Sequence, residues 1–316
     1  MAGLLVVAGS AGPVLFGVWL YARGLPPLPG SVLVKAAAAG IVSQNAGIFG
    51  RWWENRYAQY AALPLVLICL ALIAAWRHAR RRGEPHAAQI AGFGLVIAGL
   101  QFFVGRFNGF SRYELYAAGA GLLAAAAGLA PAARTWRIGA ARAGAGLALA
   151  AVLACFPYVR RAFELPAAAS GIYRQQFQMH RFAIQYWRAS VAVNDIGLVS
   201  YENPNYVLDL WGLGSEAARR VRGEEPGADW MDRLARQSDT GLAMIYPQWF
   251  PTLPEGWRLV GMLRLRHGYL VNGGRDVGFY ATNAAALPRI EAALREFVPT
   301  LPARADFMWK DGGPKL

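Results

Sequence analysis

The first part of the sequence has very little negative charge. No aspartate occurs before Asp195, and the preceding 194 residues hold only four glutamates, Glu54, Glu84, Glu114 and Glu164. Such depletion is typical of membrane proteins. Five apolar stretches approach the roughly 20 residues that a bilayer-spanning helix needs: Leu4 to Leu20, Ala61 to Trp76, Ala87 to Val104, Leu115 to Ala130 and Ala143 to Tyr158. The composition therefore predicts a polytopic α-helical membrane domain of about five spans over residues 1–160.

Cysteine and lysine are also scarce. Both cysteines, Cys69 and Cys155, lie inside apolar stretches, which excludes a disulfide framework in the C-terminal part and a zinc site of recognisable spacing. The formal net charge of +13 comes almost entirely from arginines distributed along the whole chain. A nucleic-acid-binding protein concentrates such charge on one face or helix, so we expect no nucleic-acid partner. We also expect no metal site.

The positions of the arginines predict an orientation. Short loops near Arg77 to Arg82 and Arg134 to Arg142 are densely basic, so the positive-inside rule places them in the cytoplasm and the C-terminal part outside. The first apolar stretch has no preceding basic residue and no following cleavage site, so we expect no cleaved signal peptide. A first span without a positive anchor indicates an internal span of a longer polytopic protein, and we expect sequence upstream of Met1.

Candidate lipid-phosphate ligands lie at the expected outer membrane edge. Lys35 follows a Pro-rich stretch, and Arg106 and Arg112 lie between the third and fourth apolar stretches, near Tyr113 and Glu114. Arginine grips phosphate with two hydrogen bonds, and a neighbouring glutamate can accept a proton. The alternative is that these arginines only reach lipid headgroups or pair with Glu114.

Residues 161–316 have the pattern of a small α/β domain. Strands are predicted at 190–201, with a turn, and at 206–210, 242–246, 257–265 and 277–281, and helices at 173–187, 215–222, 230–237 and 287–297. This alternation indicates layers of helices on a sheet. The tip, Asp306 to Leu316, is expected to fray.

Possible site residues of this domain are few. Gly212 to Ala217 matches a dinucleotide-binding glycine pattern, although a tight turn with Ser215 as helix N-cap explains it equally. Asp195 and Asp209 are either acids at strand ends facing a cleft or turn-forming residues. No serine or cysteine nucleophile with a histidine base is recognisable.

Three motifs resemble the C-terminal half of bacterial GT-C glycosyltransferases, in the arabinofuranosyltransferase-like and mannosyltransferase-like branch. They are Leu28-Pro29-Gly30-Ser31 to Lys35, then Arg112-Tyr113-Glu114-Leu115-Tyr116, and last Asn194-Asp195-Ile196-Gly197 with Tyr201 and Val207-Leu208-Asp209-Leu210-Trp211-Gly212-Leu213.

The resemblance implies transfer of a sugar from a polyprenyl-phosphate donor to a cell-envelope glycan or lipid acceptor, without a cofactor, at the bacterial inner membrane with an extracytoplasmic C-terminal domain. It implies that Lys35, Arg106 and Arg112 contact the lipid phosphate, and that Tyr113, Asp195, Tyr201 and Asp209 face the acceptor. The family's base lies in an early outside loop, which this sequence lacks, so only Glu54 and Glu114 could stand in for it from the membrane half. The alternative is a non-catalytic membrane protein whose outer domain binds a glycan or a protein partner.

Overall fold

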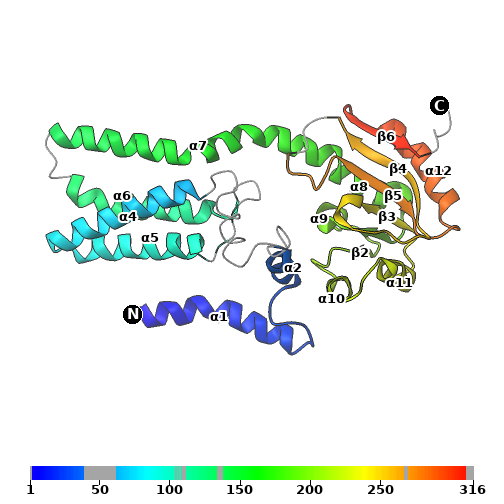
Figure 1. Ribbon diagram of the computed structural model, residues 1–316, viewed down its shortest axis with the longest axis horizontal. Coiled ribbons are helices and arrows are strands. Elements are labelled where there is room, and N and C mark those ends of the chain that lie inside the picture. The colour runs from blue at the N-terminus through cyan, green and yellow to red at the C-terminus, as the bar shows by residue number, and fades with distance from the viewer. Residues whose placement is uncertain are drawn as a thin grey trace. The chain divides into compact units, whose positions relative to one another are not determined.

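The computed structural model describes residues 2–38, 62–103, 105, 107, 112–133, 138–266 and 270–310. These residues form two compact units, one made of Met1–Ile41 with Pro166–Leu316 and the other of Val42–Leu165. The elements and their labels are shown in Figure 1.

The second unit is helical. Its helices are α4 (Leu63–Arg82), α5 (Pro85–Phe103), α6 (Leu115–Ala133) and the first part of the long α7 (Ile138–Arg174). Small residues let α4, α5 and α6 approach closely. A Cβ atom at Gly94 would lie 2.5 Å from the Cβ of Ala124, and one at Gly121 would lie 2.5 Å from the Cγ2 of Ile68.

The expected membrane domain of about five spans is wrong. Helices form at all five apolar stretches, but among the described residues only α4 and α5 are long and apolar enough to cross a membrane. Within the residues whose side chains are described, the apolar helical stretches Ala11–Tyr21 and Leu115–Ala130 are shorter than these two helices. Helix α7 continues past its apolar stretch through Arg160 and Arg161, which both pair with Glu164. Apolar composition alone does not distinguish a span from a helix that packs against protein.

The first unit holds a mixed sheet and the helices around it. Its helices are α1 (Ala2–Tyr21), α2 (Gly30–Ala38), α8 (Gln176–Arg181), the π-helical segment η2 (Phe182–Trp187), α9 (Ile196–Val199), α10 (Glu216–Glu224), α11 (Asp229–Gln237), the short turns η3 (Pro247–Trp249) and η4 (Val298–Thr300), and α12 (Leu287–Phe297). Its strands are β1 (Val191–Val193), β2 (Val207–Asp209), β3 (Leu242–Ile245), β4 (Arg258–Leu265), β5 (Asp276–Ala281) and β6 (Ala305–Trp309).

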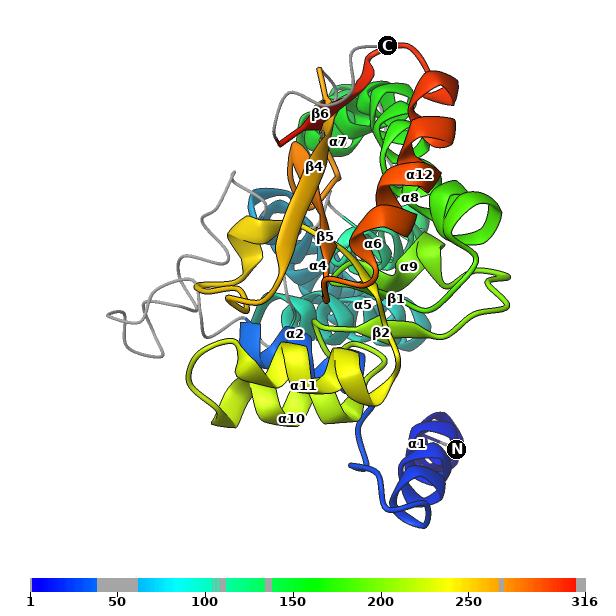
Figure 2. The ribbon, with the colours of Figure 1, turned by 90° about the vertical axis from the view of Figure 1, so that its right-hand side faces the viewer.

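The six strands are ordered β2-β1-β3-β5-β4-β6. Strand β1 pairs in parallel with both β2 and β3, and the remaining pairs are antiparallel. Residue Val193 lies opposite Asp209 on one side and Met244 on the other, so the three parallel strands end at the same level. Figure 2 shows the sheet with helices on both of its faces.

Alternation along the strands builds two cores. Val191 and Val193 pack on the face covered by α8, η2 and α12, whereas Ala192 between them packs on the face covered by α10 and α11. Strand β3 alternates likewise, with Met244 on the first face and Ala243 on the second. Strands that are buried on both faces are expected to be apolar throughout, which explains their sequences. The unit is therefore a three-layer α/β fold.

The expectation that the C-terminal tip frays from Asp306 onward is wrong for its first residues. Strand β6 pairs antiparallel with β4, and Arg264 of β4 lies opposite Asp306. Arg266 also holds Asp306 by two hydrogen bonds from its guanidinium. The sequence of β6 is short and mixes polar with apolar residues, so its own strand preference is weak and its pairing with β4 makes it a strand.

Candidate functional site

The candidate site lies where the three parallel strands end. Asn194 and Asp195 follow β1, Asp209 ends β2, and Tyr246 follows β3. Ligands of open sheets with parallel strands usually bind at the carboxyl edge of those strands. We call the group of residues around Asp195 and Tyr246 the carboxyl-edge site.

Asn194 ties two of these strand ends together. Its side chain is fully buried, and its Oδ1 accepts a hydrogen bond from the backbone N–H of Tyr246 at 3.1 Å. The Nδ2 atom donates to the carbonyl oxygen of Tyr246 at 3.5 Å. Both polar groups of the amide are thus used to hold Tyr246 beside the end of β1.

The Tyr246 hydroxyl joins the strand ends to α8. It donates to Gln175 Oε1 at 2.8 Å and accepts from Gln176 Nε2 at 3.0 Å. Burial raises the pKa of Tyr246, and the negative charge of Asp195 raises it further. The phenol therefore stays protonated and keeps a fixed direction of donation.

Asn272, in the β4–β5 connection, completes the amide network. Its Nδ2 donates to Gln176 Oε1 at 2.7 Å, to Gln175 Oε1 at 2.9 Å and to the carbonyl oxygen of Gly171 at 3.2 Å. Its Oδ1 is buried and finds no hydrogen-bond donor in the described part of the chain. A buried acceptor without a donor costs about 1–3 kcal/mol, so this atom indicates a place for a water or a ligand donor.

Asp195 is the carboxylate of the site. It is half-buried, and its Oδ2 accepts from Gln176 Nε2 at 3.1 Å. Although Asp195 precedes α9, its side chain makes no capping hydrogen bond. Among the described residues no cation pairs with it. Gln176 therefore links the two side chains: its Nε2 donates to the carboxylate of Asp195, and its Oε1 accepts from the Nδ2 of Asn272.

Two half-buried tryptophans stand beside this network. Trp211, after β2, and Trp249, after β3, meet edge to face with ring centroids 4.8 Å apart. The Trp249 ring also stacks on Tyr246 at 5.4 Å, and its Nε1 donates to the carbonyl oxygen of Gly273 at 2.9 Å. A Cβ atom at Gly273 would lie 2.6 Å from the rings of Trp249 and Tyr246, so glycine is needed where the β4–β5 connection passes these two rings.

The structure gives Asp209 the turn-forming role that the sequence left open. Its side chain is 1% exposed, and its carboxylate accepts hydrogen bonds from the backbone N–H groups of Trp211, Gly212 and Gly214, at 2.9, 3.1 and 2.6 Å. Such convergent N–H groups bind phosphate in nucleotide sites. Here Asp209 itself occupies them, and Ser215 caps α10 through the N–H of Ala218. The glycine pattern is thus a turn into a helix.

The other predicted site residues lie elsewhere. Tyr201, which is 60% exposed, lies just after α9. Arg112 is exposed and its guanidinium lies 5.7 Å from the ring of Tyr113, while Glu114 is 1% exposed just before α6. The backbone of Lys35 is in α2, but its side chain, Glu54 and Arg106 lie outside the described structure. The described residues therefore bring together none of the three expected phosphate ligands, whose grouping stays a prediction.

Sequence reasoning missed Gln175, Gln176, Tyr246, Trp249 and Asn272. They come from three segments, and only the tertiary structure joins them. Two features of the sequence could have drawn attention to them. One is the pair of adjacent glutamines in a predicted helix, and the other is the Asn272-Gly273-Gly274 turn between two predicted strands.

Comparison with known proteins adds one match. A family model described as a domain of unknown function, DUF8728, matches residues 168–280. No curated protein and no solved structure matches the chain. The matched segment contains all of the residues of the carboxyl-edge site, so over this segment the chain is similar to a domain of unknown function.

Proposed function

We propose that the α/β unit binds a glycan at the carboxyl-edge site. The observation that carries the proposal is a pair of acceptors on the two side chains that Gln176 links. They are the carboxylate of Asp195, which accepts from Gln176 Nε2, and the buried Oδ1 of Asn272, which has no donor among the described residues and whose Nδ2 donates to Gln176 Oε1. Sugar hydroxyl groups are neutral donors that match such acceptors. With no cation paired to Asp195 in the described structure, its negative charge is available to accept from a hydroxyl.

The aromatic side chains support the same ligand class. Trp211 and Trp249 are both partly exposed next to the polar network, and the guanidinium of Arg222 lies 3.8 Å from the Trp211 ring. Ligand sites commonly combine apolar or aromatic walls with a few convergent polar groups. A sugar ring has both an apolar C–H face and polar hydroxyl edges, which suits this combination.

Glycosyl transfer from a polyprenyl-phosphate sugar, as in the GT-C enzymes that the sequence resembles, is a second candidate. What favours it is Asp195, because a half-buried carboxylate without an ion-pair partner in the described structure can take the proton of an acceptor hydroxyl. In that case the glycan at the carboxyl-edge site is the acceptor and the lipid-linked sugar is the donor.

The test uses the purified full chain on an array of cell-envelope glycans, followed by calorimetry with the glycan that binds best. We expect Asp195→Asn to weaken binding about tenfold or more, since a hydrogen bond to a charged group is lost. The matched control is Asp229→Asn, an exposed aspartate on α11, which should bind as the wild type does.

Two results would contradict glycan binding: no glycan retained by the wild type, or equal binding by Asp195→Asn and Asp229→Asn. Transfer is measured separately, with a radiolabelled polyprenyl-phosphate sugar and the bound glycan. Transfer that is absent in Asp195→Asn but present in Asp229→Asn supports the second candidate. Binding without any transfer by the wild type rejects it.

A further inference from the structure

Helix α1 exposes apolar side chains around its circumference. Between Ala11 and Tyr21 it carries no charged residue. The exposed large apolar side chains of this stretch are Val14, Leu15, Phe16, Val18, Trp19 and Tyr21. A helix that is apolar on all sides is stable inside protein or in lipid, and the described residues leave these side chains uncovered.

The C-terminal end of α1 has the residues of a membrane–water boundary. The guanidinium of Arg23 lies 4.4 Å from the ring of Trp19, and Tyr21 is 74% exposed. Tryptophan and tyrosine gather at the headgroup level of a bilayer, and arginine extends there to reach phosphate. This end of α1 therefore marks where lipid headgroups would lie.

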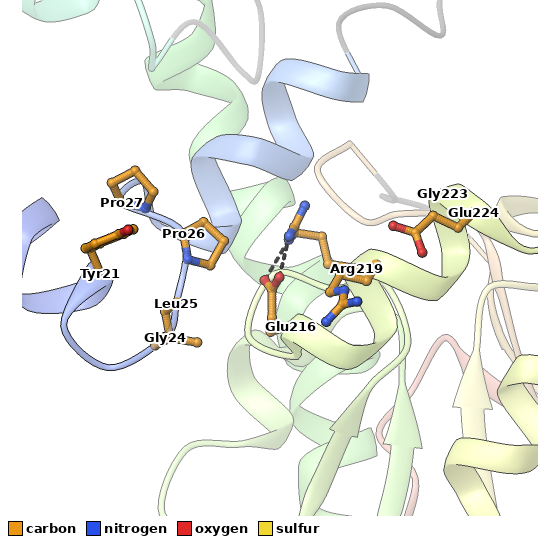
Figure 3. Close-up of a pocket in the computed structure, with 10 residues that line it drawn as sticks. Tyr21, Gly24, Leu25, Pro26, Pro27, Glu216, Arg219, Gly223 and Glu224 are labelled. Carbon is orange, nitrogen blue, oxygen red and sulfur yellow. Dashed lines mark hydrogen bonds and ion pairs between the residues drawn. The ribbon is translucent and has the colours of Figure 1, made fainter.

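A cavity of about 820 Å³ opens beside this boundary, within the first unit (Figure 3). Its walls are the loop after α1 and one side of α10: Tyr21, Gly24, Leu25, Pro26, Pro27, Glu216, Arg219, Arg220, Gly223 and Glu224. The loop is held in place by close backbone contacts. A Cβ atom at Gly17 would lie 3.0 Å from the carbonyl oxygen of Pro27, and one at Gly30 would lie 3.1 Å from that of Leu213.

The charges of the cavity leave one cation and one anion available. Arg219 and Glu216 neutralise each other through a two-point ion pair, drawn as dashed lines in Figure 3. Arg220 and Glu224, four residues apart on α10, are both exposed, and within the described structure neither forms an ion pair. A ligand that carries one negative and one positive group complements this pair.

We propose that the cavity binds the headgroup of a phospholipid that ends in a primary ammonium, with phosphate at Arg220 and the ammonium at Glu224. The acyl chains then lie along the exposed apolar side chains of α1. Guanidinium–phosphate and ammonium–carboxylate contacts are charge-assisted hydrogen bonds, and both need N–H donors. A trimethylated ammonium has none, and a glycerol headgroup lacks the positive charge. The site therefore prefers phosphatidylethanolamine to phosphatidylcholine and phosphatidylglycerol.

The test is native mass spectrometry of the full chain in detergent with equimolar amounts of these three lipids. We expect the wild type to retain phosphatidylethanolamine at least about threefold over each of the others. Arg220→Gln should lower retention of all three lipids, and Glu224→Gln should remove the preference over phosphatidylcholine. The matched control is Arg295→Gln with Glu291→Gln, an exposed pair with the same spacing on α12, which should change neither quantity.

Equal retention of the three lipids by the wild type would overturn the proposal. So would a Glu224→Gln variant that prefers phosphatidylethanolamine over phosphatidylcholine as strongly as the wild type does. Soluble phosphoethanolamine separates a lipid site from a site for the free headgroup. If it competes as strongly as the whole lipid, the contact of acyl chains with α1 is wrong. Circular dichroism of each variant confirms folding, which exposed glutamine substitutions are expected to preserve.

Discussion

The Oδ2 atom of Asp209 accepts a hydrogen bond from the backbone N–H of Gly214 at 2.6 Å, across a five-residue turn. The other carboxylate oxygen accepts from Trp211 and Gly212. The carboxylate of Asp209 thus occupies the convergent backbone N–H groups that would bind phosphate in a nucleotide-binding protein. The turn carries the chain from β2 into α10, whose Arg220 and Glu224 line the headgroup cavity.

Asp209→Asn should destabilise the α/β unit by about 1–3 kcal/mol, because an amide nitrogen cannot accept from the N–H of Gly214. Urea unfolding followed by tryptophan fluorescence measures the change. The control is Asp229→Asn, on the exposed side of α11. A midpoint for Asp209→Asn equal to that of the control would show that the turn does not depend on the carboxylate.

Gly273→Ala should weaken both folding and ligand binding, because the added Cβ atom would lie 2.6 Å from the rings of Trp249 and Tyr246. Overpacking of this kind costs about 1–3 kcal/mol. Gly256→Ala is the matched control, since a Cβ atom there meets nothing within 4 Å. Thermal unfolding of the two variants should differ by several degrees, and equal melting temperatures would contradict the close approach of the loop.

The ion pair between Glu216 and Arg219 should make stability depend on pH. The hydrogen bond from Arg219 holds the pKa of Glu216 below its ordinary value of 4.5. A lowered pKa in the folded state means that the contribution is complete above the ordinary value and is lost as pH falls through the folded value. The difference in unfolding free energy between wild type and Glu216→Gln should therefore be larger at pH 6.5 than at pH 3.

Arg219→Gln provides the control for this titration. Without the guanidinium of Arg219, a further Glu216→Gln change should give a difference that varies less with pH, because only the charge of Arg220 then lowers the pKa of Glu216. An equally strong pH dependence with and without Arg219 would assign the effect to other groups.

In the helical unit, Gly121→Ala should loosen the packing of α6 on α4, because its Cβ atom would lie 2.5 Å from the Cγ2 of Ile68. The neighbouring Gly119→Ala meets nothing within 4 Å and is the matched control. Thermal stability of the full chain in detergent, read by size-exclusion chromatography after heating, should fall for Gly121→Ala only. A loss of equal size in both variants would show that the contact with Ile68 is not the cause, because alanine has the higher helix propensity and should by itself stabilise α6.

The sequence predicted much of the sheet. The apolar runs at 242–246, 257–265 and 277–281 are strands within one residue at each end, and the helices at 230–237 and 287–297 also form. These segments are buried and strongly patterned, so local preference and tertiary packing agree. Strand β6 was missed because its sequence is mixed, and only its pairing with β4 makes it a strand.

Local sequence by itself determined where most helices and strands form, because their periodicity, N-caps and turns depend on residues a few positions apart. It did not determine β6, nor α9 (Ile196–Val199), which forms within a run predicted as strand. Only the tertiary structure decided which residues meet at the carboxyl edge. Asn272 reaches Gln176 across 96 positions, and Tyr246 reaches it across 70. Contacts at such separations depend on strand order and on how α8 packs against the sheet, and neither leaves a pattern in the neighbouring sequence.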